Sequence, residues 1–260
     1  MGVNFLQAVS QDNVFITHGH IDHIQAIAAH AAERSLIGMS PAVYYVPSHL
    51  VLHVEQIMAS FSAMQESPIP AKIVGIEAGA SIQVSSKVIV KAFPTVHRVA
   101  SLGYVAYALS KSLKSEYVGL PGRELGALRK QNVEIENVVL TPVVAYTGDT
   151  TIDFFDKEDV ANDFMRANVL VTECTYADDG TDEGKATSRG HIHLGQIARR
   201  FNRFQNKALV LTHFSARYSF RQICETVAAR LPSDKDRPTV FVAYGEFVAR
   251  LHDEKAVAEL

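Results

Sequence analysis

The sequence predicts an α/β protein in which sheets pack face to face and helices cover their outer sides. Two observations support this class. Short apolar runs rich in β-branched residues alternate with helical patterns along the whole 260-residue chain. Hydrophobic residues make up 47% of the chain and charged residues 20%, a balance typical of a globular protein with a buried core. Because no repeat, low-complexity tract or linker interrupts the pattern, we expect a single domain over residues 1–260.

The first half of the chain is predicted to begin with alternating strands and helices and to continue as consecutive strands. Pro47 ends an apolar run, and Ser48 is the expected N-cap of the helix that follows it. Turns containing Gly79 and Ser85-Ser86 separate the later strands. The elements expected here are strands at 14–16, 43–46, 72–76, 81–84, 88–93 and 103–109, and helices at 24–34 and 48–65.

The second half is predicted to alternate between helices and short apolar strands. This pattern is typical of strands that helices connect within a layered fold. The elements expected here are helices at 121–131, 193–204, 218–231 and 247–260, and strands at 138–146, 169–172, 208–212 and 240–243.

The charge and the cysteine content exclude several classes of protein. The formal net charge is -3, so any contact with RNA requires a local basic patch rather than a general electrostatic attraction. Cys174 and Cys224 form no CxxC pair and suggest no disulfide framework. The first residues show no signal peptide, and no apolar run reaches membrane-spanning length. We therefore expect a cytoplasmic protein without membrane contact, with an organelle or the nucleus left open.

The strongest motif is the segment 17–23, THGHIDH, which lies between a predicted strand and a predicted helix. At the His and Asp frequencies of this chain, H-x-H-x-D-H arises by chance in roughly one such chain in a thousand. In an extended loop His18 and His20 face the same way and can bind one ion. Asp22 and His23 begin the helix and can reach a second ion. Imidazoles and carboxylates suit Zn²⁺, whereas the alternative interpretation is a histidine-rich surface loop.

Three further candidate ligands stand just beyond apolar runs, where loops place functional groups. They are His97, Asp149 and His213, and each alone would be an ordinary loop residue. Together, downstream of H-x-H-x-D-H, they supply the additional donors that two tetrahedral ions need. The histidines expected to be surface or hydrogen-bonded core residues are His30, His49, His53 and His252.

The ligand pattern resembles the metallo-β-lactamase superfamily, whose members form a four-layer αββα sandwich with metals at one sheet edge. The resemblance implies two Zn²⁺ per chain, with Mn²⁺ or Fe²⁺ as alternatives, and a hydroxide between the ions as the nucleophile. The implied ligands are His18, His20 and His97 for one ion, Asp22, His23 and His213 for the other, and Asp149 as the bridge.

Segments beyond the ligands resemble ribonuclease Z, the tRNA 3′-processing endonuclease of this superfamily. The segment 172–175, TECT, is similar to the HEAT segment of that family, with Thr172 and Cys174 in place of the usual His and Ala. The segment 190–193, GHIH, is similar to the HST segment that opens the next helix, and His191 is the matching residue.

The resemblance also implies separate catalytic roles for residues around the scissile bond. Asp22, Glu173 and His191 are the implied catalytic residues. His191 lies 22 residues before His213 and would donate a proton to the departing 3′ oxygen, while Glu173 orients it. A purely structural carboxylate is the alternative for Glu173. His193 is expected to pack at the N-terminus of a helix.

The segment 211–218, LTHFSARY, resembles the HxSxRY segment of ribonuclease Z. It implies that Ser215 and Arg217 hold a phosphate near the scissile bond, because a guanidinium binds phosphate oxygens in bidentate fashion. A structural ion pair is the alternative for Arg217. The resemblance covers nearly the whole chain. Shorter segments that resemble the short, plant-type ribonuclease Z are 10–12, 103–105, 116–120 and 147–151.

The segment 111–137 corresponds to an arm that protrudes from ribonuclease Z and grips the tRNA elbow. Here the segment is short and lacks the Gly-Pro pair typical of bacterial arms. A solvated helix or a support for dimerisation is therefore an alternative of equal weight to an arm that grips tRNA. Its basic residues are Lys111, Lys114, Arg123, Arg129 and Lys130.

At its amino end the chain departs from the family pattern, because members usually carry further strands before the first motif. We therefore expect missing edge strands and exposed backbone at one sheet. The resemblance implies a homodimeric, zinc-dependent endoribonuclease that removes the 3′ trailer of precursor tRNA. The alternatives are another hydrolase of this fold, such as a glyoxalase II-like thioesterase, or a catalytically impaired form that acts as a binding or dimerisation module.

Overall fold

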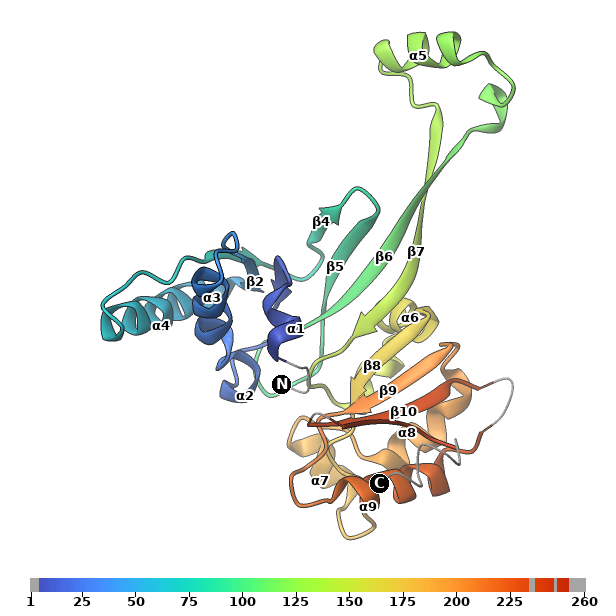
Figure 1. Cartoon of the computed structure of the whole chain (residues 1–260). Coiled ribbons are helices and arrows are strands. Elements are labelled where there is room, and N and C mark those ends of the chain that lie inside the picture. Colours follow the sequence, from blue (N-terminus) through green and yellow to red (C-terminus); the bar gives the residue numbers. More distant parts are fainter. Residues whose placement is uncertain (1–4, 234–236, 246, 253–260) are drawn as a thin grey trace.

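Figure 1 shows the fold as a computed structural model, which describes residues 5–233, 237–245 and 247–252. The strands form two sheets. One is three-stranded, in the order β1-β2-β3, and the other is eight-stranded, in the order β11-β10-β9-β8-β7-β6-β5-β4. No described helix is both long and apolar enough to cross a lipid bilayer.

The three-stranded sheet is parallel throughout, with β2 in the centre. Parallel neighbours need a crossover connection, and here helices supply it. The strands are β1 (Asn13–Phe15), β2 (Val43–Pro47) and β3 (Lys72–Ile76). The helices of this part are α1 (Phe5–Val9), α2 (Ile21–Ile24), α3 (Ile27–Leu36), the 3₁₀ turn η1 (Ser48–Leu50) and α4 (Val51–Met64).

The eight-stranded sheet joins an antiparallel half to a parallel half. The antiparallel half consists of β4 (Ser81–Ser85), β5 (Val88–Pro94), β6 (Leu102–Leu113) and β7 (Glu136–Tyr146). Parallel pairing continues from β7 through β8 (Val169–Glu173), β9 (Ala208–Thr212) and β10 (Thr239–Tyr244), and β11 (Phe247–Arg250) is an antiparallel edge. The helices of this half are η3 (Ile152–Asp156), α6 (Glu158–Arg166), α7 (Glu183–Ser188), α8 (Leu194–Arg200), η4 (Phe201–Arg203) and α9 (Phe220–Arg230).

Three apolar clusters establish the order of the layers. In the first, Val54 of α4 packs with Tyr44 of β2, so α3 and α4 cover the outer face of the small sheet. In the second, Ile76 of β3 packs with Tyr104 of β6, between the two sheets. The third lies between the large sheet and α6, α8 and α9. The resulting order of helix, sheet, sheet and helix confirms the predicted αββα sandwich.

Strands β6 and β7 extend beyond the sheet as a long hairpin that Figure 1 shows projecting from the body of the protein. Their pairing runs from Tyr104↔Tyr146 out to Leu113↔Glu136. The tip carries η2 (Ser115–Tyr117) and α5 (Gly122–Lys130), and α5 contains no buried residue. Segment 111–137, called the arm below, is therefore a helix-tipped hairpin with much of its surface open to solvent.

Several local predictions differ from the structure, and three of them are informative. The closing helix predicted over 247–260 is wrong in its described part, because aromatic and β-branched residues at 247–250 pair with the open edge of β10 as strand β11. Residues 253–260 lie outside the described residues. Ser48 makes no capping bond and begins η1 instead. Helix α6 is absent from the prediction, although Ala161 and Phe164 form its buried stripe.

Candidate metal centre

The candidate metal centre lies where loops leave one end of both sheets. The segment carrying the H-x-H-x-D-H motif follows β1, and the loops after β5, β7 and β9 supply the other candidate ligands. The backbone N–H of Leu102 donates to the carbonyl oxygen of Thr17 over 2.9 Å, which ties the first loop to the large sheet. Residues far apart in the sequence therefore converge because the strands that precede them end at a common edge.

Four side chains surround the first candidate cation position. Nδ1 of His20 lies 3.0 Å from Nε2 of His18 and 3.3 Å from Nε2 of His97. Oδ2 of Asp149 lies 3.8 Å from Nε2 of His18 and 4.0 Å from Nε2 of His97. Two donors bound to one Zn²⁺ in tetrahedral geometry are about 3.3 Å apart, so this donor set fits a single ion.

Three further side chains, together with Asp149, surround the second position. The Nε2 atoms of His23 and His213 lie 3.3 Å apart. Oδ2 of Asp22 lies 3.4 Å from the first of these atoms and 3.5 Å from the second. Oδ2 of Asp149 lies 3.4 Å from both. One oxygen of Asp149 therefore faces both positions, which is the placement that a bridging ligand requires.

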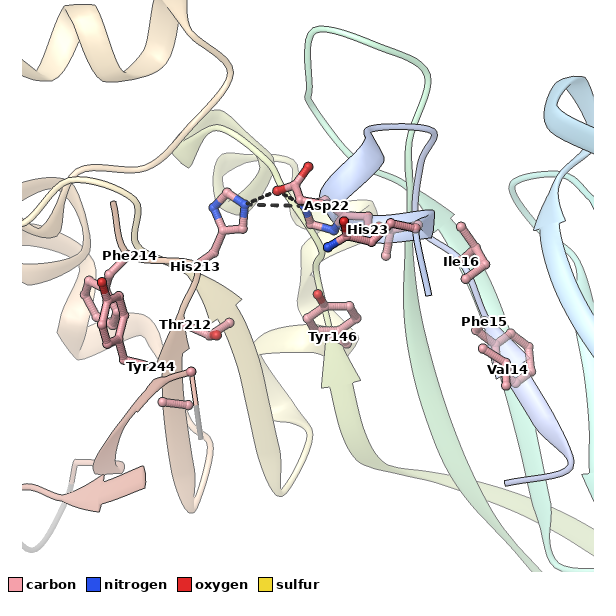
Figure 2. Close-up of a pocket in the computed structure, with 14 residues that line it drawn as sticks. Val14, Phe15, Ile16, Asp22, His23, Tyr146, Thr212, His213, Phe214 and Tyr244 are labelled. Carbon is pink, nitrogen blue, oxygen red and sulfur yellow. Dashed lines mark hydrogen bonds and ion pairs between the residues drawn. The ribbon is translucent and has the colours of Figure 1, made fainter. Parts of the chain in front are cut away.

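A cleft of about 410 Å³ opens beside the second position (Figure 2). Asp22, His23 and His213 lie at the metal-centre side of this cleft, as Figure 2 shows. The side chains of Phe15 and Tyr244 contribute to its walls from the two sheets. The second position is therefore the more open one, in keeping with the 60% exposed side chain of Asp22.

The approach of Asp149 to the first loop depends on Gly148. The φ angle of this glycine is +61°, and a Cβ atom there would lie 2.7 Å from Cγ2 of Thr17. Asp149 itself is only 2% exposed. Any larger residue at position 148 would therefore separate the Asp149 carboxylate from the loop that carries His18.

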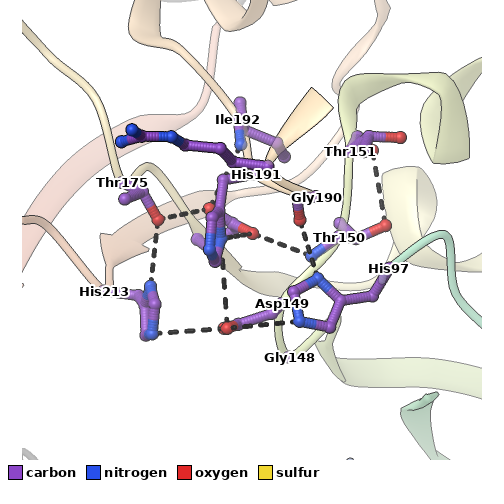
Figure 3. A network of polar contacts seen from close by, with 12 residues as sticks. His97, Gly148, Asp149, Thr150, Thr151, Thr175, Gly190, His191, Ile192 and His213 are labelled. Carbon is purple, nitrogen blue, oxygen red and sulfur yellow. Dashed lines mark hydrogen bonds and ion pairs between the residues drawn. The ribbon is translucent and has the colours of Figure 1, made fainter. Parts of the chain in front are cut away.

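Hydrogen bonds on the far side of the rings fix which nitrogen can bind a cation. Nδ1 of His97 donates to the carbonyl oxygen of Gly190 over 2.8 Å, which leaves the lone pair on Nε2. The hydroxyl of Thr175 donates to Oε2 of Glu173 over 2.6 Å and lies 3.0 Å from Nδ1 of His213. That hydroxyl therefore accepts from His213, whose Nε2 lone pair also faces the centre (Figure 3).

Burial and the surrounding charges shift the pKa values of several candidate ligands. Burial and the neighbouring His23 lower the pKa of His18 to about 3. Burial also lowers the pKa of His97. Burial alone would raise the pKa of Asp149, but the contact with His23 and the charges of the surrounding histidines hold it below its ordinary value. A neutral imidazole at His18 or His97 and an ionised carboxylate at Asp149 are the forms that bind a metal ion. Burial would lower the pKa of His23, but its contact with Asp149 raises that pKa above its ordinary value.

Glu173 and His191 form a hydrogen-bonded pair beside the carboxylate of Asp149. Nδ1 of His191 lies 3.0 Å from Oε1 of Glu173 and 3.9 Å from Oδ2 of Asp149. Glu173 is 1% exposed and also accepts from the backbone N–H groups of Thr150 and Ile192. Burial would lower the pKa of His191, but the hydrogen bond and charge of Glu173 raise it above its ordinary value. The imidazole is therefore poised to donate a proton.

The predicted phosphate-binding residues lie just beyond His213. Ser215 is half-buried, and its backbone N–H donates to the carbonyl oxygen of Thr175. Arg217 forms an ion pair with Asp178 at 2.7 Å and lies over the ring of Tyr176, 5.2 Å from its centroid. The alternative interpretation of Arg217 as a structural ion pair therefore has direct support, although 47% of its side chain is exposed.

All of the predicted ligands converge, and two neighbours that support them lie in segments noted from the sequence without a role being assigned to them. Asp149, His191 and His213 also form a third group close enough to share a cation. Thr175 and Gly190, which orient His213 and His97, were not among the predicted residues. The roles expected for the other histidines are confirmed where contacts are described, since His193 caps α8 and His30 bonds Tyr44 and Ala8 in the core.

Comparison with known proteins establishes the class. No family model matches the sequence. The metallo-β-lactamase fold protein YhfI from Bacillus subtilis has a TM-score of 0.54 and 16% identity, over 93% of this chain and 78% of that chain. Human tRNase Z, short form, has a TM-score of 0.54 and 20% identity, over 81% and 75%. The chain is a metallo-β-lactamase-fold protein with a histidine and carboxylate cluster that fits divalent metal.

Two relatives from Arabidopsis thaliana narrow this class. tRNase Z TRZ1 is 40% identical over 226 residues, which are 87% of this chain and 80% of the relative. The chloroplastic tRNase Z TRZ2 is 33% identical over 221 residues, which are 85% of this chain and 62% of the relative. This chain belongs to the tRNase Z (ribonuclease Z) family.

Proposed function

We propose that this chain is a metal-dependent endoribonuclease that removes the 3′ trailer of precursor tRNA. The names of its relatives, tRNase Z and ribonuclease Z, support this activity over a thioesterase of the same fold. The observation that carries the proposal is the Glu173–His191 pair, held 3.9 Å from the carboxylate that faces both cation positions. A proton donor at that place is what the departure of a sugar oxygen requires.

The donor set supports two Zn²⁺ ions per chain, with Mn²⁺ and Fe²⁺ as alternatives. When bound, the ions would polarise the scissile phosphate and lower the pKa of the attacking water. His18, His20 and His97 would hold the first ion, Asp22, His23 and His213 the second, and Asp149 both.

Each catalytic side chain has a defined task in this proposal. Glu173 accepts a hydrogen bond from Nδ1 of His191. The proton that His191 would donate to the departing 3′ oxygen is therefore the one on Nε2. Water forms the new bond to phosphorus while the bond to that oxygen breaks. Asp22, with its exposed carboxylate, accepts the proton that the water loses. Ser215 and Arg217 would hold a non-bridging phosphate oxygen nearby, with Arg217 exchanging Asp178 for the phosphate.

The decisive experiment is cleavage of a trailer-bearing precursor tRNA by the zinc-loaded protein. The expected product has a free 3′ hydroxyl on the tRNA. His191→Ala is expected to lower kcat by about 10²-fold or more while the bound zinc is retained. A wild-type protein that carries metal and leaves the precursor intact would rule out the proposed activity.

The projecting arm is proposed to contact the tRNA away from the scissile bond. The hairpin places η2 and α5 at a distance from the metal centre, as Figure 1 shows. Arg129 and Lys111 pair with Glu136 at the outer end of the β6–β7 pairing, whereas Lys114, Arg123 and Lys130 pair with no carboxylate of the described residues. These cations are therefore available to phosphates.

A homodimer is also proposed, in line with the family resemblance. Large apolar side chains are exposed at the ends of α3 and along α4, including Leu36, Leu52, Phe61 and Met64. Patches of this kind mark protein contact surfaces. Light scattering coupled to gel filtration would give twice the monomer mass if the proposal holds, and Phe61→Glu would shift the mass toward the monomer.

A further inference from the structure

Two arginines flank His191 without a carboxylate partner. Arg98 directly follows the candidate ligand His97, and Arg189 ends α7 two residues before His191. Both are exposed. Within the part of the chain that the structure describes, neither forms an ion pair, whereas the nearby Arg217 is held by Asp178. The guanidinium groups most available beside the proton donor are therefore those of Arg98 and Arg189.

The backbone of Gly190 fixes these two arginines relative to the metal centre. Its carbonyl oxygen accepts from Nδ1 of His97 over 2.8 Å. A Cβ atom at Gly190 would lie 2.8 Å from that nitrogen and 2.9 Å from Cγ of Arg98, so only glycine permits this contact. Arg98 and the segment that carries Arg189 and His191 are thus packed directly against each other.

Arg189 is anchored on its other side by a tyrosine. Its Nη1 donates to the hydroxyl of Tyr176 over 3.1 Å. The ring of Tyr176 lies edge-on to His191, with centroids 6.4 Å apart. Two carboxylates beside Tyr176 and His191 are already engaged, because Asp178 pairs with Arg217 and Glu173 accepts bonds from four donors. A phosphate is therefore the anion that can satisfy Arg98 and Arg189.

We propose that Arg98 and Arg189 form a phosphate-binding rim that holds the RNA backbone on the His191 side of the metal centre. The proposal rests on the nuclease function above and adds the residues that grip nucleotides next to the scissile bond. On that side His191 meets the departing 3′ oxygen, so the rim grips the tRNA end rather than the trailer. Guanidinium groups bind phosphate oxygens in fixed, paired geometry, which aligns the bond to be cleaved.

The test is binding of precursor tRNA by the full chain in EDTA, where cleavage does not interfere, at a series of salt concentrations. Arg98→Gln and Arg189→Gln are each expected to weaken binding roughly fivefold at physiological salt and to reduce the slope of log Kd against log salt by about 0.7–0.9. The matched control is Arg166→Gln, because Arg166 is exposed, forms no ion pair with any described carboxylate, and precedes β8 at the opposite end from Glu173. Circular dichroism checks that the variants fold.

The outcomes separate the rim from the nuclease function. Variants that lose affinity and salt slope, with an unaffected Arg166→Gln control, support the rim even when the zinc-loaded wild type fails to cleave. Binding by Arg98→Gln and Arg189→Gln that matches the control would overturn the rim, even when the wild type cleaves normally. A wild-type protein that binds no precursor tRNA overturns it as well.

Discussion

Nδ1 of His191 donates to Oε1 of Glu173 over 3.0 Å, and this bond determines which nitrogen of the imidazole is left for the substrate. Glu173 is buried and held by two backbone N–H groups and a threonine hydroxyl, so its position does not depend on His191. A fixed carboxylate behind a histidine both orients the ring and favours its charged form. This arrangement supports the proposed role of His191 as the proton donor.

The first prediction concerns the charge of Glu173. Glu173→Gln is expected to lower kcat for precursor tRNA by about 10²-fold, because His191 loses the group that orients and charges it. Since Glu173 raises the pKa of His191, its removal lowers that pKa. The proton-donating form then disappears at a lower pH, and the alkaline limb of the kcat profile moves toward acid. Activity measured from pH 5 to 9 checks this.

A matched control for this variant is Glu183→Gln. Glu183 also contacts a histidine, with Oε1 3.8 Å from Nδ1 of His193, but it lies outside the metal centre. Its replacement is expected to leave the pH profile of kcat in place. Equal profiles for Glu173→Gln and the wild type would contradict the assigned role.

The second prediction concerns the bridge. Oδ2 of Asp149 lies within 4.0 Å of donors at both cation positions, so Asp149→Ala is expected to weaken both together. His97→Ala removes a ligand from the first position alone and should leave about one ion per chain. Elemental analysis after dialysis against dilute zinc distinguishes the two variants. Retention of two ions by Asp149→Ala would show that the carboxylate does not bridge.

The third prediction separates backbone strain from steric contact at Gly148. Gly148→Ala places Cβ 2.7 Å from Thr17 at a φ of +61°, whereas Gly38→Ala meets no atom within 4 Å at a φ of +73°. Both should lose about 1 kcal/mol of unfolding free energy from the left-handed backbone. Only Gly148→Ala should lose a further 1–3 kcal/mol or so through overpacking, together with zinc affinity. Urea titration gives the difference, and equal losses would contradict the contact.

The grouping of the candidate metal ligands was predictable because their spacing follows from elementary geometry. Alternate residues of an extended loop face one ion, and His97, Asp149 and His213 each follow a strand whose apolar run is visible in the sequence. The strand edge then brings them together. The segments that contain Thr175 and Gly190 were noted from the sequence, but their hydrogen bonds to His213 and His97 were not predictable, because the sequence does not specify which side chain such a hydroxyl or carbonyl contacts.

The errors in the predicted fold arise from tertiary contacts that the sequence does not specify. The segment 247–250 has no strict alternation, and its strand exists because β10 offers an unpaired edge, which is tertiary information. The pairing of Arg217 with Asp178 depends on a loop whose course the sequence does not specify. The sequence therefore predicts which residues follow a strand, but it does not predict which group a long side chain such as that of Arg217 contacts.

The fourth prediction uses an ion-pair group remote from the metal centre. Hydrogen bonds from Arg200, together with Arg203, lower the pKa of Asp156 below its ordinary value of 3.8. A carboxyl group whose pKa is lower in the folded state than in the unfolded state stabilises the fold at pH values above the unfolded-state pKa. This stabilisation is lost as the pH falls through the folded-state pKa. Because Asp156 is 41% exposed, Asp156→Asn should cost less than about 1 kcal/mol at pH 7. Urea midpoints at pH 7 and near pH 3 should show the difference shrinking toward zero, and a constant difference would contradict the ion-pair explanation.

The last prediction tests the arm through its unpaired cations. The double variant Arg123→Gln/Lys130→Gln is expected to raise KM for precursor tRNA roughly fivefold. It should also reduce the salt dependence of binding, because a protein with fewer phosphate contacts releases fewer counterions when it binds RNA. Turnover of a small phosphodiester, which reaches only the metal centre, should stay at the wild-type value because the arm projects away from it. Lys157→Gln, an exposed cation outside the arm, is the control for lost charge alone. An arm that serves only as a solvated helix would give the double variant the same KM as this control, and the proposed tRNA contact would then be wrong.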